Sequence, residues 1–449
     1  MTNSFEGPES QTPPVPYPIP QASIAEEFSL KTAPLLAQKP VGKKYIWLVV
    51  LAQFGIFVAF ITPIAISLAI KVSQLAPGQE EVLGYVTGLG ALASVIATPL
   101  LGMLSDRTKS RFGRRRPFIL SGVVVGTVAL FIMATATTLP ALALGWILTQ
   151  IGWGAGALAG VQTSTADRLS PEQRGKVAGL GGFATQVAPA LGVGIAGAFA
   201  GDNLLLFLVP GAIGVVLTLA FVVFIKEADS REMALNGRLS LAVIASKFFF
   251  NPRKHKDYAW NWLGRFLFYF GLALSTTFTA YFFAQRLGVT LQEVAGVLVP
   301  LSLIGLVATT LGALGGGFLS DKFRRRRIFV LVSALIYAGG AVVTGLAPGI
   351  EMLYIGGALT ALGIGIFSAV DQALLLDILP ERETDAGRYM GIISFAATIP
   401  QSIAPLIAPL FVGIGVAAGG DKNYSLLFFL AAAVVVAGGF VILRIRGTR

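Results

Sequence analysis

The sequence contains no cysteine and only one histidine among its 449 residues. Without cysteine the chain can form no disulfide and no thiolate metal site. The single histidine, His255, lies in a polar stretch, which leaves little from which to build a histidine metal site or a histidine-activated nucleophile. We therefore expect no metal, no cofactor and no enzyme activity.

Charge is scarce as well. Lys, Arg, Asp and Glu make up 13% of the residues, whereas 55% are hydrophobic and the mean hydropathy is +0.75. A soluble domain is about one-quarter charged, so this chain has too little polar surface to face water on all sides. Its 53 glycines lie largely within apolar runs, as in membrane helices that pack closely. The composition therefore predicts a membrane protein.

Residues 1–44 depart from this composition. The segment is polar and has six prolines in its first twenty positions. Such a segment buries little apolar surface, and we predict a disordered cytoplasmic arm. It lacks the basic start and apolar core of a signal peptide, so we do not interpret it as one.

Twelve apolar stretches are long enough to cross a bilayer, whose core of ~30 Å needs about 20 residues. They are 45–70, 82–104, 117–138, 141–166, 177–200, 203–225, 258–284, 292–319, 328–346, 351–379, 388–416 and 424–443. We predict an all-α membrane protein with 12 transmembrane helices in two six-helix bundles, 45–225 and 258–443. A cytoplasmic linker, 226–257, joins the bundles, and residues 444–449 form a cytoplasmic tail.

The basic residues are unevenly distributed between the two sides of these spans. If the N-terminus and every second connection are assigned to the cytoplasm, these segments hold 30 of the 34 Lys and Arg residues. The outer connections hold only Lys71, Arg286 and Lys422, and Arg265 lies within a span. This bias predicts that both termini are cytoplasmic. It also accounts for the net charge of +11 without a nucleic-acid partner.

The two halves of the sequence repeat the same motifs in the same order. LSDR at 104–107 returns as LSDK at 319–322, and each is followed by an arginine cluster, at 114–116 and 324–327. The dipeptide PE at 171–172 returns at 380–381, and the glycines at 175 and 179 return at 387 and 391. Parallel six-helix halves around a site near the midplane are an architecture of secondary transporters.

Residues 102–117 read GMLSDRTKSRFGRRRP. This segment resembles the signature of the major facilitator superfamily between its second and third helices, and TKSRF before GRRRP is similar to the glycoside–pentoside–hexuronide and sucrose/H⁺ symporters. The resemblance implies the major facilitator fold, alternating access and a sugar or glycoside substrate coupled to a cation. The chain departs from that branch in one respect, because 82–104 contains no carboxylate and the fourth span has none before Asp167. An N-terminal sodium site is therefore not expected.

Charged residues gather where the second helix of each half ends. A carboxylate at Asp106 or Asp321 can cap a neighbouring helix and pair with nearby arginines. Such clusters would hold the halves closed on the cytoplasmic side and break when the halves rock. The alternative is that the arginines only set the topology. The predicted cytoplasmic gate comprises Asp106, Arg107, Arg114, Arg115, Asp321, Lys322 and Arg325.

Arg265 and Asp371 are ionisable residues within predicted spans. Charges at membrane depth cost about 2.5–3.5 kcal/mol each on insertion scales, so they are generally paired and functional. Counted from the cytoplasmic ends of their spans, both lie about 10–12 Å deep at a rise of ~1.5 Å per residue. We predict an ion pair in which Asp371 is the proton-coupling acid and Arg265 its partner. The alternative is a static structural pair.

The repeat places neutral amides opposite these charges. An offset of 209 residues relates Gln162 to Asp371, and an offset of 212 relates Gln53 to Arg265. Glutamine suits sugar hydroxyls because it both donates and accepts hydrogen bonds; each such residue can instead bridge helices. The predicted substrate-binding residues are Gln53, Trp153, Gln162, Gln150, Tyr269, Gln372 and Gln401.

The tryptophans fall into two groups. Trp47, Trp260 and Trp262 lie near cytoplasmic helix starts and Trp146 lies near an outer end, so we interpret these four as an interfacial belt. Trp153 lies about 12 residues into its span and hence near the midplane. There its indole either stacks on a sugar face or packs against protein.

These patterns favour a secondary transporter of the cell membrane, which moves a sugar or glycoside by proton-coupled symport. Its expected partners are the small-molecule substrate, protons and the lipid bilayer. One alternative is a proton-coupled exporter of amphipathic small molecules, and another is a transporter-like membrane sensor. Aromatics and amides around the cavity would favour a sugar, whereas a largely apolar lining would favour amphipathic compounds.

Overall fold

The computed structural model describes residues 40–225, 227–233, 249–381, 385–416 and 421–447. Residues 1–39 of the predicted arm and half of the predicted linker (226 and 234–248) lie outside these residues. All regular structure in the described parts of the chain is helical. The all-α prediction is therefore confirmed.

The first half of the chain contributes a set of helices that begins with α2. Two of its spans contain a π-helical segment, labelled η2 and η3. The elements are α2 (Lys43–Thr62), η2 (Pro63–Ser67), α3 (Leu68–Leu75), α4 (Val82–Arg107), α5 (Arg116–Thr135), α6 (Leu139–Thr149), η3 (Gln150–Leu158), α7 (Ala159–Arg168), α8 (Pro171–Ala198) and α9 (Asn203–Phe224).

The second half begins with a bent pair of helices. The elements are α11 (Lys256–Thr277), α12 (Thr279–Leu287), α13 (Leu291–Phe323), α14 (Arg326–Leu346), α15 (Ile350–Ile378), α16 (Ala386–Val412) and α17 (Tyr424–Ile442). Within the described residues, 11 helices are long and apolar enough to cross a membrane, and α11 with α12, bent by 45°, makes the twelfth span. The prediction of twelve spans is confirmed.

Glycines allow α5 and η3 to approach closely. A methyl group on Gly156 would lie 2.8 Å from the Cα atom of Gly122, so no larger residue fits there without a shift of the backbone. Small residues have this role in membrane helices, where close backbone approach replaces a hydrophobic driving force. The glycine-rich stretch from Gly152 to Gly160 is thus explained by packing.

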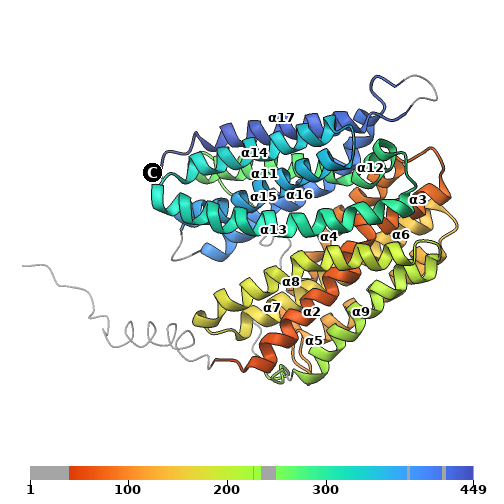
Figure 1. Ribbon diagram of the computed structural model, residues 1–449. Coiled ribbons are helices and arrows are strands. Elements are labelled where there is room, and N and C mark those ends of the chain that lie inside the picture. Colours follow the sequence, from red (N-terminus) through yellow and green to blue (C-terminus); the bar gives the residue numbers. More distant parts are fainter. Residues whose placement is uncertain (1–39, 226, 234–248, 382–384, 417–420, 448–449) are drawn as a thin grey trace, which may run out of the picture.

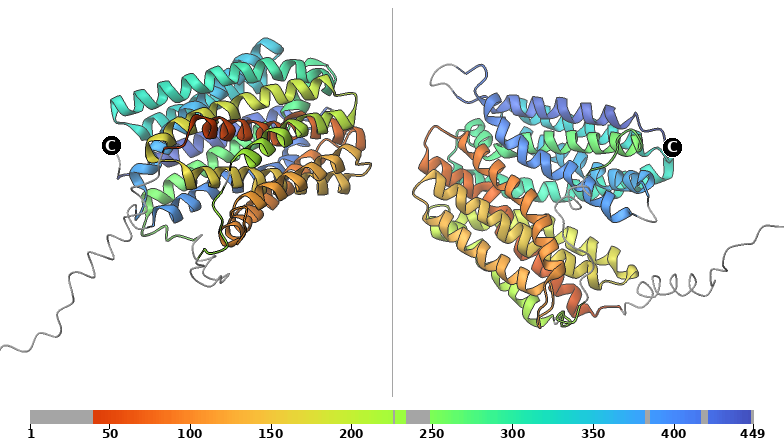
Figure 2. Two further views of the ribbon diagram at one scale, coloured as in Figure 1. Left: turned by 90° about the horizontal axis from the view of Figure 1, so that it is seen from below. Right: turned by 180° about the vertical axis from the view of Figure 1, so that it is seen from behind.

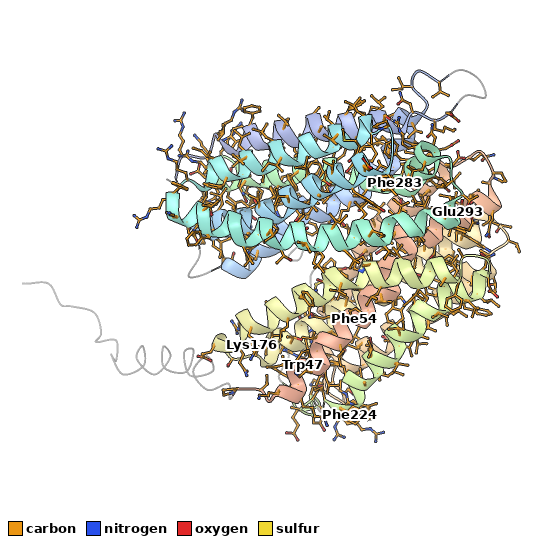
Figure 3. The ribbon with its side chains drawn as sticks, viewed as in Figure 1. Trp47, Phe54, Lys176, Phe224, Phe283 and Glu293 are labelled. Carbon is orange, nitrogen blue, oxygen red and sulfur yellow. The ribbon has the colours of Figure 1, made fainter. Side chains whose placement is uncertain are left out.

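The two halves meet at one end of the molecule and diverge toward the other (Figures 1 and 2). At the end where they diverge lie the start of α2, the C-terminal end of α17 and the arginine clusters 114–116 and 324–327. We call this the arginine-rich end, and the other the closed end. Lys176 and Trp47 lie toward the arginine-rich end, whereas Phe283 and Glu293 lie at the closed end (Figure 3).

One residue of the predicted tryptophan belt does not face lipid. Trp146 is fully buried, its ring stacks on Phe60 at 6.1 Å, and its indole Nε1 donates to the carbonyl of Thr87 at 3.4 Å. The prediction for Trp146 is therefore wrong, because Phe60 of α2 and the backbone of α4 cover a ring that its position in the span alone would leave in the interface. Trp47, by contrast, is 55% exposed.

Candidate functional site

A cavity of about 660 Å³ lies between the halves. Its walls come from α2, η2, α4 and η3 on one side and from α11 and α16 on the other. Among the residues the structure describes, no charged side chain lines it. Apolar side chains cover much of the wall, and seven hydroxyls interrupt them. These belong to Thr87, Ser94, Thr98, Thr276, Thr277, Ser394 and Thr398.

Six of these seven hydroxyls donate to a backbone carbonyl of their own helix. The oxygen-to-oxygen distances are between 2.6 and 3.3 Å, as for Thr277 with Ala273 and Thr398 with Ser394. A hydroxyl has one hydrogen and two lone pairs, so a group whose hydrogen is directed to its own helix faces the cavity as an acceptor. The cavity therefore offers a ligand more acceptors than donors.

Two predicted substrate-binding residues, Gln150 and Gln401, line this cavity from opposite halves. Gln150 is 5% exposed and begins η3, and Gln401 is exposed on α16. Their amides add donors to the acceptor-rich wall. Phe60, stacked on Trp146, supplies an aromatic face on the same side as Gln150.

The other predicted substrate-binding residues lie away from this cavity. Trp153 is fully buried and its indole packs against Gly126, as in the packing alternative. Gln53 lies against Gly181 of α8. Two more, Gln162 and Gln372, are exposed outside the cavity, whereas Tyr269 packs under Arg265. The spacing of these residues could not tell which face of each helix turns inward.

The closed end is held by contacts between the halves. Gly88 of α4 faces α16 so closely that a methyl group on it would lie 2.9 Å from the carbonyl oxygen of Ser402. The Tyr281 hydroxyl donates to the carbonyl of Ala69 at 2.8 Å. Nearby, Lys422 pairs with Glu81 at 3.0 Å, each side chain being about one-third exposed.

The predicted pair of Arg265 and Asp371 is present inside the second half. Nη1 of Arg265 lies 3.0 Å from Oδ2 of Asp371. Asn261, one helical turn before Arg265 on α11, donates from Nδ2 to Oδ1 of the same carboxylate at 2.9 Å. Asp371 is 1% exposed and Asn261 is fully buried, whereas the side chain of Arg265 is 15% exposed. Asn261 was not predicted, although an amide four residues from an intramembrane arginine is a recognisable pattern.

Each half carries an acid–arginine–acid cluster at the arginine-rich end. In the first half Arg115 pairs with Asp106 at 2.6 Å and with Asp167 at 3.2 Å. In the second half Arg326 pairs with Asp321 at 3.1 Å and with Asp377 at 2.8 Å. The repeat visible in the sequence is thus a repeat of ion pairs.

Several predicted gate residues occupy other positions than expected. The arginine that pairs in the second half is Arg326, whereas Arg325 and Lys322 are exposed. Arg325 is the residue before α14, so its side chain leaves the helix in a different direction. Arg114 pairs with Asp167 at 2.7 Å. The ion pairs of Arg114, Arg115 and Asp321 described above join groups of the same half.

No group of three or more His, Asp or Glu side chains in the described parts of the chain is placed to hold a metal ion. The chemistry available is therefore that of a neutral cavity between the halves, a buried ion pair in one half, and ion-pair clusters at the arginine-rich end.

A family model described as Major Facilitator Superfamily matches residues 45–316 and 306–449. The chain belongs to this superfamily. It is a multi-pass membrane transporter of a small-molecule substrate.

Among individual proteins, the chain is 24% identical over 405 residues to Multidrug resistance protein 2 of Bacillus subtilis (strain 168), covering 88% of this chain and 94% of that protein. It is 49% identical over 47 residues, 10% of this chain and 8% of that protein, to General alpha-glucoside permease of Schizosaccharomyces pombe (strain 972 / ATCC 24843).

Solved structures resemble the whole fold. The nucleoside transporter NupG superposes with a TM-score of 0.69 and 15% identity, covering 90% of this chain and 98% of NupG. A bacterial homologue of the human lysosomal transporter Spinster, in an inward-facing and unoccupied conformation, gives a TM-score of 0.70 and 18% identity, covering 90% of this chain and 99% of that one.

Proposed function

We propose that this protein moves a neutral, hydroxyl-rich molecule, a sugar or glycoside, by proton-coupled symport through alternating access. In this proposal the arginine-rich end faces the cytoplasm across the cell membrane, in accord with the excess of Lys and Arg there. The halves diverge at that end, so the conformation described above is open to the cytoplasm.

The uncharged lining of the cavity is the observation that carries this proposal. An ionic substrate moved into a cavity without a counter-charge would lose hydration without recovering it. A neutral sugar loses only hydrogen bonds to water, and its hydroxyl hydrogens meet acceptors such as Thr98 and Thr277. Gln150 and Gln401 accept and donate to the remaining hydroxyls, and Phe60 packs against the apolar face of a ring.

An exporter of amphipathic small molecules is the second candidate. Apolar residues such as Ile61, Ile64 and Leu272 cover a large part of the same wall, and the whole-length relative is a multidrug resistance protein. A lipophilic ligand with few donors would bury its apolar surface there at about 25 cal/mol per Å². The mainly apolar wall meets the criterion set above for amphipathic compounds. We still prefer the sugar, because such a ligand would leave Gln150, Gln401 and the hydroxyls of the same wall without partners.

Asp371 is the group we assign to proton coupling, with Arg265 as its partner. A buried carboxylate beside an arginine is stable when charged, and it can take a proton when water or substrate changes its surroundings. The partly exposed side chain of Arg265 gives the pair contact with accessible space. A static structural pair is the alternative to this role.

The acid–arginine–acid clusters form the cytoplasmic gate in this proposal. In the open conformation each cluster is satisfied within its own half, for example Arg115 by Asp106 and Asp167. On closing, the two clusters approach each other and can exchange partners across the interface. Such an exchange would give the closed and open conformations comparable stability.

Reconstitution tests the substrate class directly. Purified protein would first be screened by thermal shift with neutral sugars, glycosides, nucleosides and lipophilic cations, because a ligand that binds the folded state raises its stability. The hits would then be followed as radiolabelled uptake into liposomes with an imposed proton gradient. Gradient-driven uptake of a sugar or glycoside is expected, with lipophilic cations inert.

Other outcomes would overturn the proposal in distinct ways. Binding and extrusion of lipophilic compounds alone would establish the exporter. Ligand binding without any transport would indicate a sensor. Uptake of the sugar at the same level with and without the gradient would retain the substrate and remove the coupling.

A further inference from the structure

The carbonyl oxygen of the Asn261 side chain is buried and has no hydrogen-bond partner. The side chain is fully enclosed, and its amide nitrogen is already committed to Asp371. An unpaired amide oxygen in a dry interior costs about 1–3 kcal/mol. Buried polar atoms without a partner are uncommon in folded proteins, and each one calls for an explanation.

The packing of the protein does not require an amide at this position. The repeat offset of 212 residues pairs Asn261 with Val49 of the first half, which is also fully buried on the first helix of its bundle. A valine thus fills the related site in the same fold. The presence of asparagine in the second half coincides with the presence of the carboxylate.

We propose that Asn261 is a positioning residue that stabilises Asp371 both with and without its proton. When the carboxyl is ionised, Nδ2 of Asn261 donates to it, as the structure has it. When Asp371 takes a proton from the water side, the carboxyl becomes a donor, and the amide turns by half a rotation so that Oδ1 accepts that hydrogen. Asparagine can do this because its two terminal atoms have similar size and opposite hydrogen-bonding character.

The other groups around Asp371 cannot hydrogen-bond both its ionised and its protonated form. Arg265 donates only, and it stays charged throughout, so it favours the ionised carboxyl alone. Tyr269, on the same helix, lies under the guanidinium, and Tyr258, two turns before Arg265 on α11, donates to the backbone of Tyr389 on α16. On α14, Arg326 contacts the backbone of Ala373 and pairs with Asp377 nearer the arginine-rich end.

Aromatic rings lie one helical turn from Asp371. Phe367 lies one turn before Asp371 on α15 and stacks on Phe268 of α11 at 3.6 Å. Asp371 itself is 1% exposed, so a protonated Asp371 needs a protein acceptor. The orphaned oxygen of Asn261 is the acceptor within reach. This inference rests on the proposed coupling role of Asp371. It adds a residue that stabilises both the ionised and the protonated state of that carboxyl.

A pair of variants of nearly equal shape tests the inference. Asn261→Val removes both hydrogen-bonding atoms in the manner of the first half, whereas Asn261→Thr keeps a hydroxyl that can donate and accept. The measurement is infrared difference spectroscopy between acidic and alkaline samples of the full-length protein in lipid vesicles. The carboxylic acid band of Asp371 is identified by its loss in Asp371→Asn.

We expect Asn261→Val to shift this band and to lower proton-driven accumulation about tenfold, a change equivalent to about 1.4 kcal/mol. Exchange of labelled for unlabelled substrate without a gradient should remain within about twofold of wild type. Asn261→Thr should recover much of the wild-type band position and of the proton-driven accumulation. Tyr337→Phe, which removes another buried hydrogen bond in the same half, that to Ser275 at 2.6 Å, should leave the band unchanged.

Two results would overturn the inference. One is an Asp371 band and accumulation in Asn261→Val equal to those of the wild type. The other is an equal loss in the Val and Thr variants, which would assign Asn261 to packing. Failure of the proposed function is a separate result: Asp371→Asn would still accumulate substrate, while the band shift in Asn261→Val would continue to report the contact.

Discussion

The two halves of this transporter are alike at the arginine-rich end and unlike at membrane depth. At that end Arg115 and Arg326 each bind two carboxylates, in clusters related by the internal repeat. Deeper in the membrane, the second half contains Asp371 with its two partners, whereas the related part of the first half has only neutral residues such as Gln53 and Val49. In the proposed mechanism, the repeated ion-pair clusters serve the movement common to both halves, and the unrepeated pair of Asp371 serves proton coupling.

Neutralising the buried carboxylate of the second half, Asp371, should have the largest effect on transport. In Asp371→Asn the amide keeps the size of the side chain and cannot exchange a proton, so we expect a loss of proton-driven accumulation of about 100-fold, which corresponds to ~2.7 kcal/mol. Gradient-free exchange should persist. The measurement is uptake of a labelled substrate into liposomes with and without a proton gradient.

Glu351→Gln is the matched control, because it neutralises an exposed carboxylate at the other end of the same helix, outside the proposed gate. It should retain coupling. If Asp371→Asn accumulated substrate as well as this control did, the division of roles between the halves would be refuted.

A large side chain at the closed end should disturb the movement that the halves share. Gly88→Leu cannot fit between α4 and α16, since even a methyl group there would lie 2.9 Å from Ser402. We expect the closed end to open and the arginine-rich end to narrow. Because the chain has no cysteine, Lys176→Cys and Lys322→Cys would supply the only two sites for spin labels, one in each half.

The label-to-label distance between Lys176 and Lys322 should shorten by several ångströms in Gly88→Leu. Gly339→Leu is the control, since a Cβ atom at Gly339 meets no other atom within 4 Å. An unchanged distance distribution in Gly88→Leu would mean that the α4–α16 contact does not hold the closed end.

A smaller effect is expected from the cavity wall of the first half. Gln150→Leu removes an amide that lines the cavity, so we expect substrate affinity to fall about tenfold, equivalent to the ~1.4 kcal/mol of a lost hydrogen bond. Gln162→Leu alters an exposed amide outside the cavity and should bind as the wild type does. Thermal-shift titration measures both, and equal affinities in the two variants would contradict the assignment of Gln150.

The smallest effect should come from the ion pair between Glu81 and Lys422. It joins the halves at the closed end, but both side chains are about one-third exposed, and such pairs contribute only about 0.2–1 kcal/mol. Glu81→Lys should slow transport by about two- to fivefold, and the charge-reversed double variant Glu81→Lys with Lys422→Glu should restore it. A double variant slower than the single one would show that the two charges act independently.

The pair of Arg265 and Asp371 could be predicted because the free-energy cost of an unpaired charge inside a membrane can be estimated. Isolated charges in hydrocarbon are costly, and helical rise places both residues at a similar depth. Asn261 escaped prediction because an amide within a span has many acceptable partners. Of seven predicted substrate-binding residues, only Gln150 and Gln401 line the cavity, because the sequence does not show which face of each helix turns inward.

Sequence alone determined that this chain crosses the membrane twelve times in two related halves, because hydropathy, span length and the order of motifs are properties of the chain itself. Tertiary structure decided which faces turn toward one another. It buried Trp146 and Trp153, selected Arg326 over Arg325, and oriented the hydroxyls of the cavity toward their own helices. The physical reason is rotation: a turn of about 100° per residue separates a cavity wall from a lipid face. Only packing between helices fixes that rotation.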